Sequence, residues 1–130
     1  PSAPPAAALS QGEKIHHAAS MTRQPAVAGS FYPASPKELR AQVERLLHEA
    51  KPADVTPKAL IAPHAGYIYS GPIAATAYAT LAPRAADIHR VVLLGPSHFV
   101  PFNGLALPDA DAFATPLGSI ELDRAALTML

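Results

Sequence analysis

Two histidines stand in matching surroundings in this chain of 130 residues. His64 follows the apolar run 59–62, and His98 follows the apolar run 91–94. They lie in stretches of 25 and 18 residues that contain no Asp, Glu, Lys or Arg. Neutral imidazole is a common ligand of transition metals, with nitrogen–metal distances of about 2.0–2.2 Å. The pair therefore indicates a shared metal site, with a hydrogen-bonded structural role for each histidine as the alternative.

A metal site needs more than two ligands, and the neighbouring sequence offers few. The chain has no cysteine. Asp109 and Asp111 are the nearest carboxylates downstream of His98, but their Ala-rich, turn-like surroundings favour exposed loop positions. His89 precedes the run 91–94, so we expect it at the opposite end of that segment, away from the site.

Three further side chains are candidates for the pocket. Tyr67 and Tyr69 follow His64 and either orient a substrate through their hydroxyls or pack the loop. Ser97 lies in a Gly-Pro-Ser-His-Phe sequence that is similar to the nucleophile elbow G-x-S-x-G, but Phe99 replaces the second glycine. A hydrogen bond within its own loop is the simpler role for Ser97.

The elements expected to position these loops form a strand–helix–strand unit. The runs 59–62 and 91–94 are apolar on both faces, which is typical of strands in a sheet covered on both sides. Between them we predict a helix that begins with Ser70 as its N-cap and ends near Pro83. An anion bound at the N-terminus of this helix is the alternative role for Ser70. The two strands would then be parallel, and both histidines would lie at the carboxyl edge, where α/β sheets bind ligands.

Local signals predict the remaining elements. Ser35, Pro36 and Glu38 form a capping box that starts a helix ending near Lys51-Pro52. A third strand is expected at 105–107, an alternating strand around Ile120 and Leu122, and a helix capped by Asp123.

Composition excludes several classes of protein. Ten basic and ten acidic residues give a formal net charge of zero, which argues against a basic nucleic-acid binder. Prolines and glycines interrupt both charge-free stretches, so neither predicts a membrane helix. No signal-peptide pattern precedes the folded part, and we expect a cytoplasmic protein with no membrane contact. Residues 1–22 are expected to be a disordered leader or a mis-called start upstream of Met21.

At these motifs the chain resembles the Memo-like family, known in prokaryotes as AmmeMemoRadiSam system protein B. Four motifs in order carry the resemblance: 25–33 (PAVAGSFYP), 62–71 (APHAGYIYSG), 94–98 (LGPSH) and 115–118 (TPLG) with Asp123 following. It covers residues 23–130, which would be the N-terminal half of a Memo-like domain and thus a fragment of the full domain.

The resemblance implies an α/β fold similar to the class III extradiol dioxygenases, which use non-haem iron. That fold has three layers, with a mostly parallel or mixed sheet and helices on both faces. The resemblance further implies that His64 and His98 match two metal-site positions, for an iron or copper ion. The third position, often a cysteine, falls in the later part of family members.

Two functions remain open from the sequence, beside the alternative of a structural relic that binds no ligand. The first is a metal-dependent, dioxygenase-like oxidoreductase whose reaction is unsettled. The second is a non-catalytic protein that binds a peptide, a small molecule or a partner, and the resemblance suggests AMMECR-type and radical-SAM proteins as such partners. Metal content and oxygen uptake would discriminate between the two.

Overall fold

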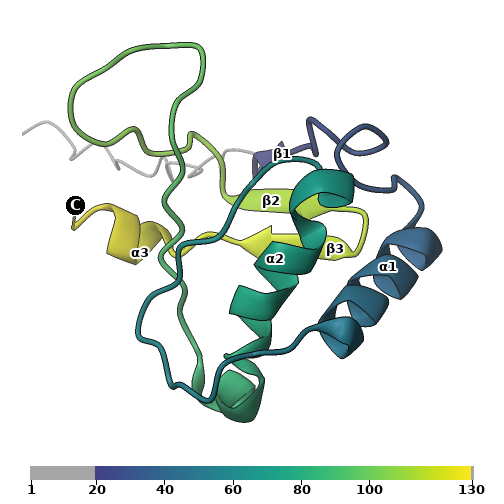
Figure 1. Cartoon of the computed structure of the whole chain (residues 1–130). Coiled ribbons are helices and arrows are strands. Elements are labelled where there is room, and N and C mark those ends of the chain that lie inside the picture. Colours follow the sequence, from purple (N-terminus) through teal and green to yellow (C-terminus); the bar gives the residue numbers. More distant parts are fainter. Residues whose placement is uncertain (1–19, 130) are drawn as a thin grey trace, which may run out of the picture.

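The computed structural model describes residues 20–129, and the chain there is a small mixed α/β structure (Figure 1). Most of the predicted leader 1–22 lies outside the described residues. The elements in chain order are β1 (Thr22–Arg23), α1 (Pro36–Glu49), α2 (Tyr67–Ala79), a 3-10 helix (Ala82–Asp87), β2 (Ala112–Thr115), β3 (Gly118–Glu121) and α3 (Arg124–Leu127).

The sheet has three strands in the order β1-β2-β3 and is mixed. β1 pairs parallel with β2, with Thr22 opposite Ala112, although 90 residues separate them in the chain. β2 and β3 form an antiparallel hairpin that ends at the pair Thr115 and Gly118. Gly118 takes a φ of +132° at this turn, a conformation that side chains rarely adopt. The strand predicted around Ile120 is therefore confirmed, and so is the mixed α/β class.

Helix α1 begins where its capping signal predicts. The Ser35 hydroxyl accepts a hydrogen bond from the Glu38 backbone N–H at 3.4 Å, and Pro36 is the first helical residue. The helix ends at Glu49, because Ala50 is already extended two residues before Pro52. Leu39 on its inner face is 4% exposed. Local sequence thus determines both ends of this helix.

Helix α2 begins four residues earlier than predicted. Tyr67 is its first residue and Gly66 its N-cap, so Ser70 lies inside the helix and the N-cap and anion-site interpretations of Ser70 are wrong. The Ser70 hydroxyl instead donates to the Ala65 carbonyl at 2.7 Å. Regular α-helix stops at Ala79, and the 3-10 helix carries the chain past Pro83.

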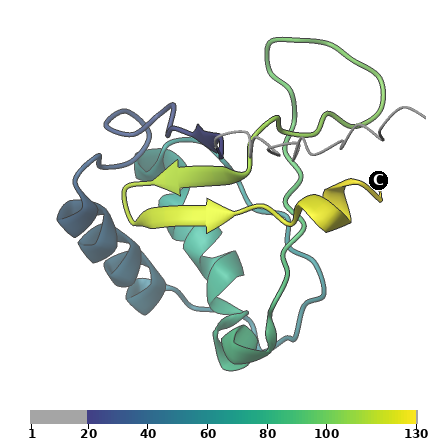
Figure 2. The same ribbon diagram turned by 180° about the vertical axis from the view of Figure 1, so that it is seen from behind.

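Helices α1 and α2 pack against each other, and a glycine allows their close approach. A Cβ on Gly71 would lie 3.0 Å from Leu46 Cδ1, so a larger side chain there would push the helices apart. Helix α2 lies over one face of the sheet, in front of the strands in Figure 1 and behind them in Figure 2. The buried apolar side chains of the described part are few: Leu39, Ala75, Ala110 and Ala112.

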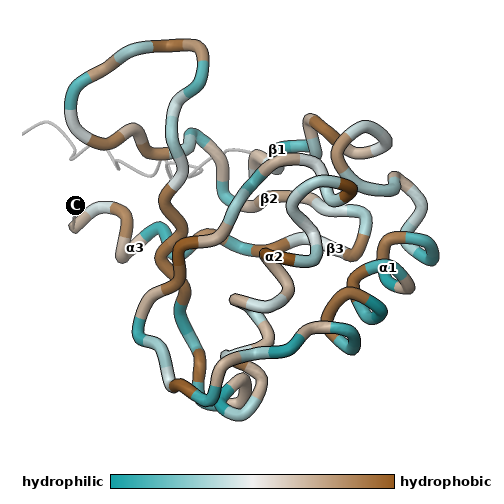
Figure 3. Tube along the Cα trace, in the orientation of Figure 1, coloured by the Kyte–Doolittle hydropathy of each residue, from teal (hydrophilic) through white to brown (hydrophobic). Residues whose placement is uncertain are grey.

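The strands expected at 59–62, 91–94 and 105–107 are not formed, so these three predictions are wrong. Their residues belong to irregular segments outside the sheet, and Figure 3 shows the first two runs as brown, apolar stretches of the tube. The physical reason is that a strand with two apolar faces needs paired neighbours and covering layers. The described residues supply neither to these segments.

Helix α3 is short, and one hydrogen bond and one ion pair of Asp123 hold its start. Asp123 caps it, since Oδ1 accepts from the Ala126 backbone N–H at 2.9 Å as the sequence predicts. The other oxygen, Oδ2, lies 2.8 Å from the Arg90 guanidinium. Arg90 immediately precedes the run 91–94, so this ion pair ties that segment to the end of the hairpin.

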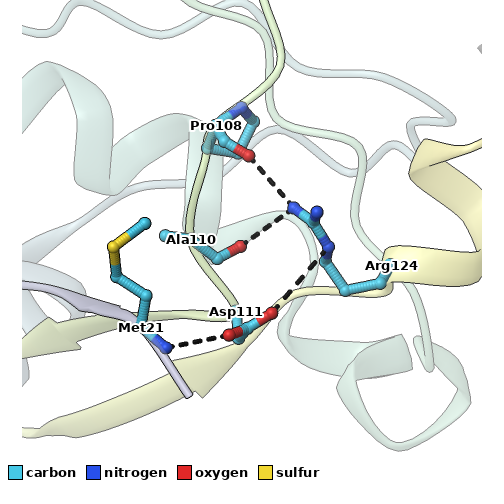
Figure 4. Close-up of polar contacts among 5 residues, drawn as sticks. All are labelled: Met21, Pro108, Ala110, Asp111 and Arg124. Atoms are coloured by element: carbon cyan, nitrogen blue, oxygen red, sulfur yellow. Dashed lines mark hydrogen bonds and ion pairs between the residues drawn. The ribbon is translucent and has the colours of Figure 1, made fainter. Parts of the chain in front are cut away.

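A second cluster joins the two ends of the described chain around Arg124 (Figure 4). One Arg124 nitrogen donates to the carbonyls of Pro108 and Ala110, both at 3.1 Å. Its Nε lies 3.9 Å from Asp111 Oδ1, while Asp111 Oδ2 accepts from the Met21 backbone N–H at 2.8 Å. The cluster links α3, the start of β2 and the residue before β1. Among residues 20–129, no helix is long and apolar enough to cross a membrane.

Candidate metal centre

The structure brings His64 and His98 into direct contact, although 34 residues separate them. Their Nε2 atoms are 3.1 Å apart. The ring centroids are 5.3 Å apart and the ring planes are tilted by 36°. Both residues are exposed, so solutes can reach the two nitrogens from solvent. The loops converge here without the two predicted strands.

The turn before α1 fixes the loop that carries His64. The Tyr67 backbone N–H donates to the Phe31 carbonyl at 2.7 Å, and a Cβ on the buried Gly66 would lie 3.5 Å from the Phe31 backbone. Gly29 takes a φ of +86° and its N–H donates to the Tyr32 carbonyl at 2.7 Å, which closes this turn. The 27–32 turn therefore supports the backbone two residues after His64.

On the other side, Ser97 closes a turn next to His98. Its hydroxyl donates to the Val100 carbonyl at 2.7 Å and accepts from the Val100 N–H at 3.4 Å. The hydroxyl of Ser97 is thus engaged within its own loop. The exposed Phe99 ring meets the His98 imidazole edge-on, with centroids 6.4 Å apart.

The two candidate tyrosines differ in environment. Tyr67 is half-buried at the start of α2, with its ring centroid 5.6 Å from that of Tyr32. Burial raises the pKa of the Tyr67 hydroxyl, and the neighbouring Tyr32 and Tyr78 raise it further. Tyr67 therefore keeps its proton at neutral pH and acts there as a hydrogen-bond donor. Tyr69 is 81% exposed.

The sequence reasoning missed the supporting role of Phe31 and Tyr32. Their contacts with Gly66 and Tyr67 cross more than 30 residues of chain, and no local pattern predicts such a pairing. The 25–33 motif could have indicated this supporting role, because it contains both residues and a glycine suited to a tight turn.

Within residues 20–129, no third His, Asp or Glu joins the pair to complete a group of three potential ligands. Asp111 is held by Met21 and Arg124, and Asp109 is an exposed loop residue. His89 is exposed as well, outside any such group. The described chain thus offers a pair of solvent-exposed imidazoles with no third potential ligand beside them.

Comparison with known proteins gives a consistent result. The Memo-like protein family matches residues 23–130. The chain is 44% identical over 119 residues to the MEMO1 family protein MK0963 of Methanopyrus kandleri, covering 85% of this chain and 42% of that protein. It is 43% identical to Protein MEMO1 of Danio rerio, covering 78% of this chain and 34% of that protein. It is 42% identical to the Protein memo-1 homolog of Caenorhabditis elegans, covering 79% of this chain and 29% of that protein.

The chain therefore spans between 29% and 42% of the length of these relatives. The matched region contains the four motifs 25–33, 62–71, 94–98 and 115–118, and with them both histidine loops. By its match from residue 23 to residue 130, the chain belongs to the Memo-like protein family.

Proposed function

We propose that His64 and His98 are two ligands of one iron or copper ion. The observation that carries this proposal is the 3.1 Å separation of their Nε2 atoms. Two nitrogens bound at about 2.1 Å and at a right angle on one ion lie about 3.0 Å apart. The observed spacing fits that arrangement, and imidazole nitrogen suits both metals.

A direct hydrogen bond between the two imidazoles is the alternative for the same distance. It requires one Nε2 to carry a proton and the other to be bare. In the metal site both Nε2 atoms are bare, so each ring carries its proton on Nδ1. The two arrangements therefore differ in tautomer, which nitrogen NMR of the imidazoles reads directly.

For the full Memo-like domain we propose a dioxygenase-like oxidoreductase with a three-layer fold similar to that of the class III extradiol dioxygenases. When bound, the metal would supply Lewis-acid and redox chemistry toward dioxygen and a substrate. The chain's own residues hold that ion and shape its surroundings. His64 and His98 bind, Ser97 fixes the turn that carries His98, and Tyr67 offers a protonated hydroxyl near the His64 loop.

The test is metal binding by the purified chain and its variants. We expect one Fe(II) or Cu(II) per chain, measured by titration calorimetry and by electron paramagnetic resonance for copper. His64→Ala and His98→Ala should each weaken binding by about tenfold or more, or ~1.4 kcal/mol. His89→Ala is the matched control, because His89 is also exposed but lies outside the pair. Equal affinity in all three variants would refute the shared site.

A second candidate function is non-catalytic binding of a peptide or of an AMMECR-type or radical-SAM partner. The exposed rings of Tyr69 and Phe99 beside the histidine loops favour it, because exposed aromatic side chains are frequent anchors of interfaces. Substrate-dependent oxygen uptake by the metal-loaded protein supports the enzyme. Partner binding that is unchanged in His64→Ala and His98→Ala supports the binding protein.

A further inference from the structure

Asp123 is joined by an ion pair to the part of the chain that leads to His98. Its Oδ2 lies 2.8 Å from a terminal guanidinium nitrogen of Arg90, and Arg90 stands eight residues before His98. The same carboxylate caps α3 through Oδ1, so the helix that it starts fixes its own position. The ion pair therefore sets where the chain that leads to His98 begins.

Arg124, the next residue, holds the chain that leaves His98 (Figure 4). One of its guanidinium nitrogens donates to the carbonyls of Pro108 and Ala110, both at 3.1 Å. Its Nε lies 3.9 Å from Asp111 Oδ1. A guanidinium presents five N–H donors in a planar, fixed fork, so one arginine can meet two carbonyls and a carboxylate at once. Arg124 thus fixes the other end of the segment that carries His98.

The backbone of this Asp-Arg dipeptide is itself held in place. It follows β3, which pairs with β2, and the N–H of the preceding Leu122 donates to the Asp111 carbonyl at 2.8 Å. Because the two residues are adjacent, they bring both ends of segment 90–110 to one place. A loop whose ends are held has less conformational freedom for the residues between them. His98 lies within that loop, with its Nε2 atom 3.1 Å from that of His64.

We propose that Asp123 and Arg124 are positioning residues that hold His98 against His64. The dipeptide, here called the clasp, acts through the two ends of segment 90–110 rather than through either imidazole. The proposal rests on the proposed function only for the effect of the clasp on metal affinity. The approach of the two histidine loops is measured separately, without metal.

The exposure of the clasp predicts modest effects that depend on salt. The side chains of Arg90 and Asp123 are 70% and 41% exposed, and those of Arg124 and Asp111 are 51% and 48% exposed. Exposed ion pairs contribute little individually, and dissolved salt screens them. Loss of one contact of the clasp should therefore loosen segment 90–110, and so should high salt.

The experiment measures the approach of the two histidine loops with paired fluorophores. Because the chain has no cysteine, His64→Cys and His98→Cys supply the only thiols, and both are labelled with pyrene maleimide. Excimer emission requires two pyrenes in contact. Arg90→Gln and Arg124→Gln should each lower the excimer-to-monomer ratio by about twofold or more. High salt should lower the ratio of the doubly labelled parent in the same way.

Arg84→Gln is the matched control. The Arg84 side chain lies 3.8 Å from Asp87 in an exposed ion pair outside segment 90–110, so this variant should leave the ratio unchanged. Circular dichroism verifies that each variant is folded. An equal fall in Arg84→Gln, or an unchanged ratio in both glutamine variants of the clasp contacts, would overturn the proposal. If a variant fails to fold, the parent still decides, because a salt-independent ratio would overturn the proposal as well.

Conservative variants separate positioning from a general loss of stability. Arg90→Lys keeps a positive charge toward Asp123 and should restore most of the ratio. Arg124→Lys should not, because an ammonium lacks the planar fork that meets two carbonyls. If the clasp only stabilised the fold, the ratio would instead follow the melting temperature of each variant.

Copper binding by the chain with both histidines distinguishes this proposal from the proposed function. If both hold, Arg90→Gln should weaken Cu(II) binding by about threefold, and its electron paramagnetic resonance spectrum should show a disturbed pair of nitrogen ligands. A falling excimer ratio, combined with equal copper affinity in His64→Ala, His98→Ala and the parent, would support the clasp and refute the shared metal site.

Discussion

The backbone of Gly29 is one point on which the position of His64 depends. Its φ of +86° lets the 27–32 turn close, and that turn accepts the Tyr67 N–H through Phe31. A Cβ at Gly29 meets only Ala34 Cβ at 3.7 Å, an ordinary contact, so the constraint is conformational and not steric. A single torsion angle thus supports the loop that carries one of the two candidate ligands.

We expect Gly29→Ala to lower the free energy of unfolding by about 1 kcal/mol, because alanine is strained at that φ. Gly95→Ala is the control, since Gly95 has no positive φ and nothing within 4 Å of its added Cβ. Urea denaturation followed by circular dichroism measures both variants. Equal losses for the two substitutions would contradict a conformational role for Gly29.

At the residue scale, the sequence identified the two histidines because both are isolated in charge-free stretches after apolar runs. Their contact was expected from strand geometry, yet it arises without paired strands. Tyr32 was missed because its packing on Tyr67 depends on a long-range fold. Whether the pair binds metal stays a prediction, since a distance of 3.1 Å also fits a hydrogen bond.

At the scale of elements, those determined by local chemistry were predicted best. The start of α1 and the cap of α3 were both predicted correctly from the sequence, because a helix cap depends only on residues within one turn. Helix α2 was placed too late because Ser70 is a good N-cap residue by type but uses its hydroxyl inside the helix. The strands at 59–62 and 91–94 failed because strands depend on neighbours that no local pattern supplies.

The cap of α3 should respond to pH. A hydrogen bond from the Ala126 N–H is the main cause that lowers the pKa of the Asp123 carboxyl. Desolvation opposes it, and the Arg90 guanidinium lowers the pKa further. A folded-state pKa below the unfolded value means that the stabilisation is complete above the ordinary pKa of about 3.9. It is lost as the pH falls through the lowered value.

Carbon NMR of the Asp123 carboxyl checks this directly, and we expect its titration midpoint below the ordinary aspartate value of about 3.9. Exchange of the Ala126 amide should accelerate over the same pH range. Asp123→Asn is the control, because asparagine keeps a capping oxygen but carries no charge. An Asn variant with the same pH-dependent exchange would show that another group is responsible.

At the scale of the whole molecule, the helices and the sheet of the described part bury few side chains between them. The buried apolar residues of the described part are one leucine and three alanines. Burial contributes roughly 25 cal/mol per Å² of apolar surface, so this core gives little stability. The large exposed side chains include Ile61 and the four residues 91–94, which the sequence predicted to lie in strands of a sheet covered on both sides.

We therefore expect the chain alone to melt at low temperature with a broad transition. A well-packed domain absorbs about 0.7 kcal/mol per residue on unfolding near 60 °C, and calorimetry should give well below that figure here. A dye that reports exposed apolar surface should bind the chain before it melts. A sharp transition above about 65 °C would contradict this expectation.

The segment from Phe99 to Pro108, the green loop that leaves the histidine site in Figure 1, is secured at both ends. The Ser97–Val100 turn holds its beginning, and Arg124 holds its end through the Pro108 carbonyl. Doubling the length of a flexible loop adds only about 0.6 kcal/mol of closure entropy. Insertions or deletions there would leave both anchors in place. The length and sequence of this segment can therefore vary without loss of either anchor, and such changes would alter which molecules can approach His64 and His98.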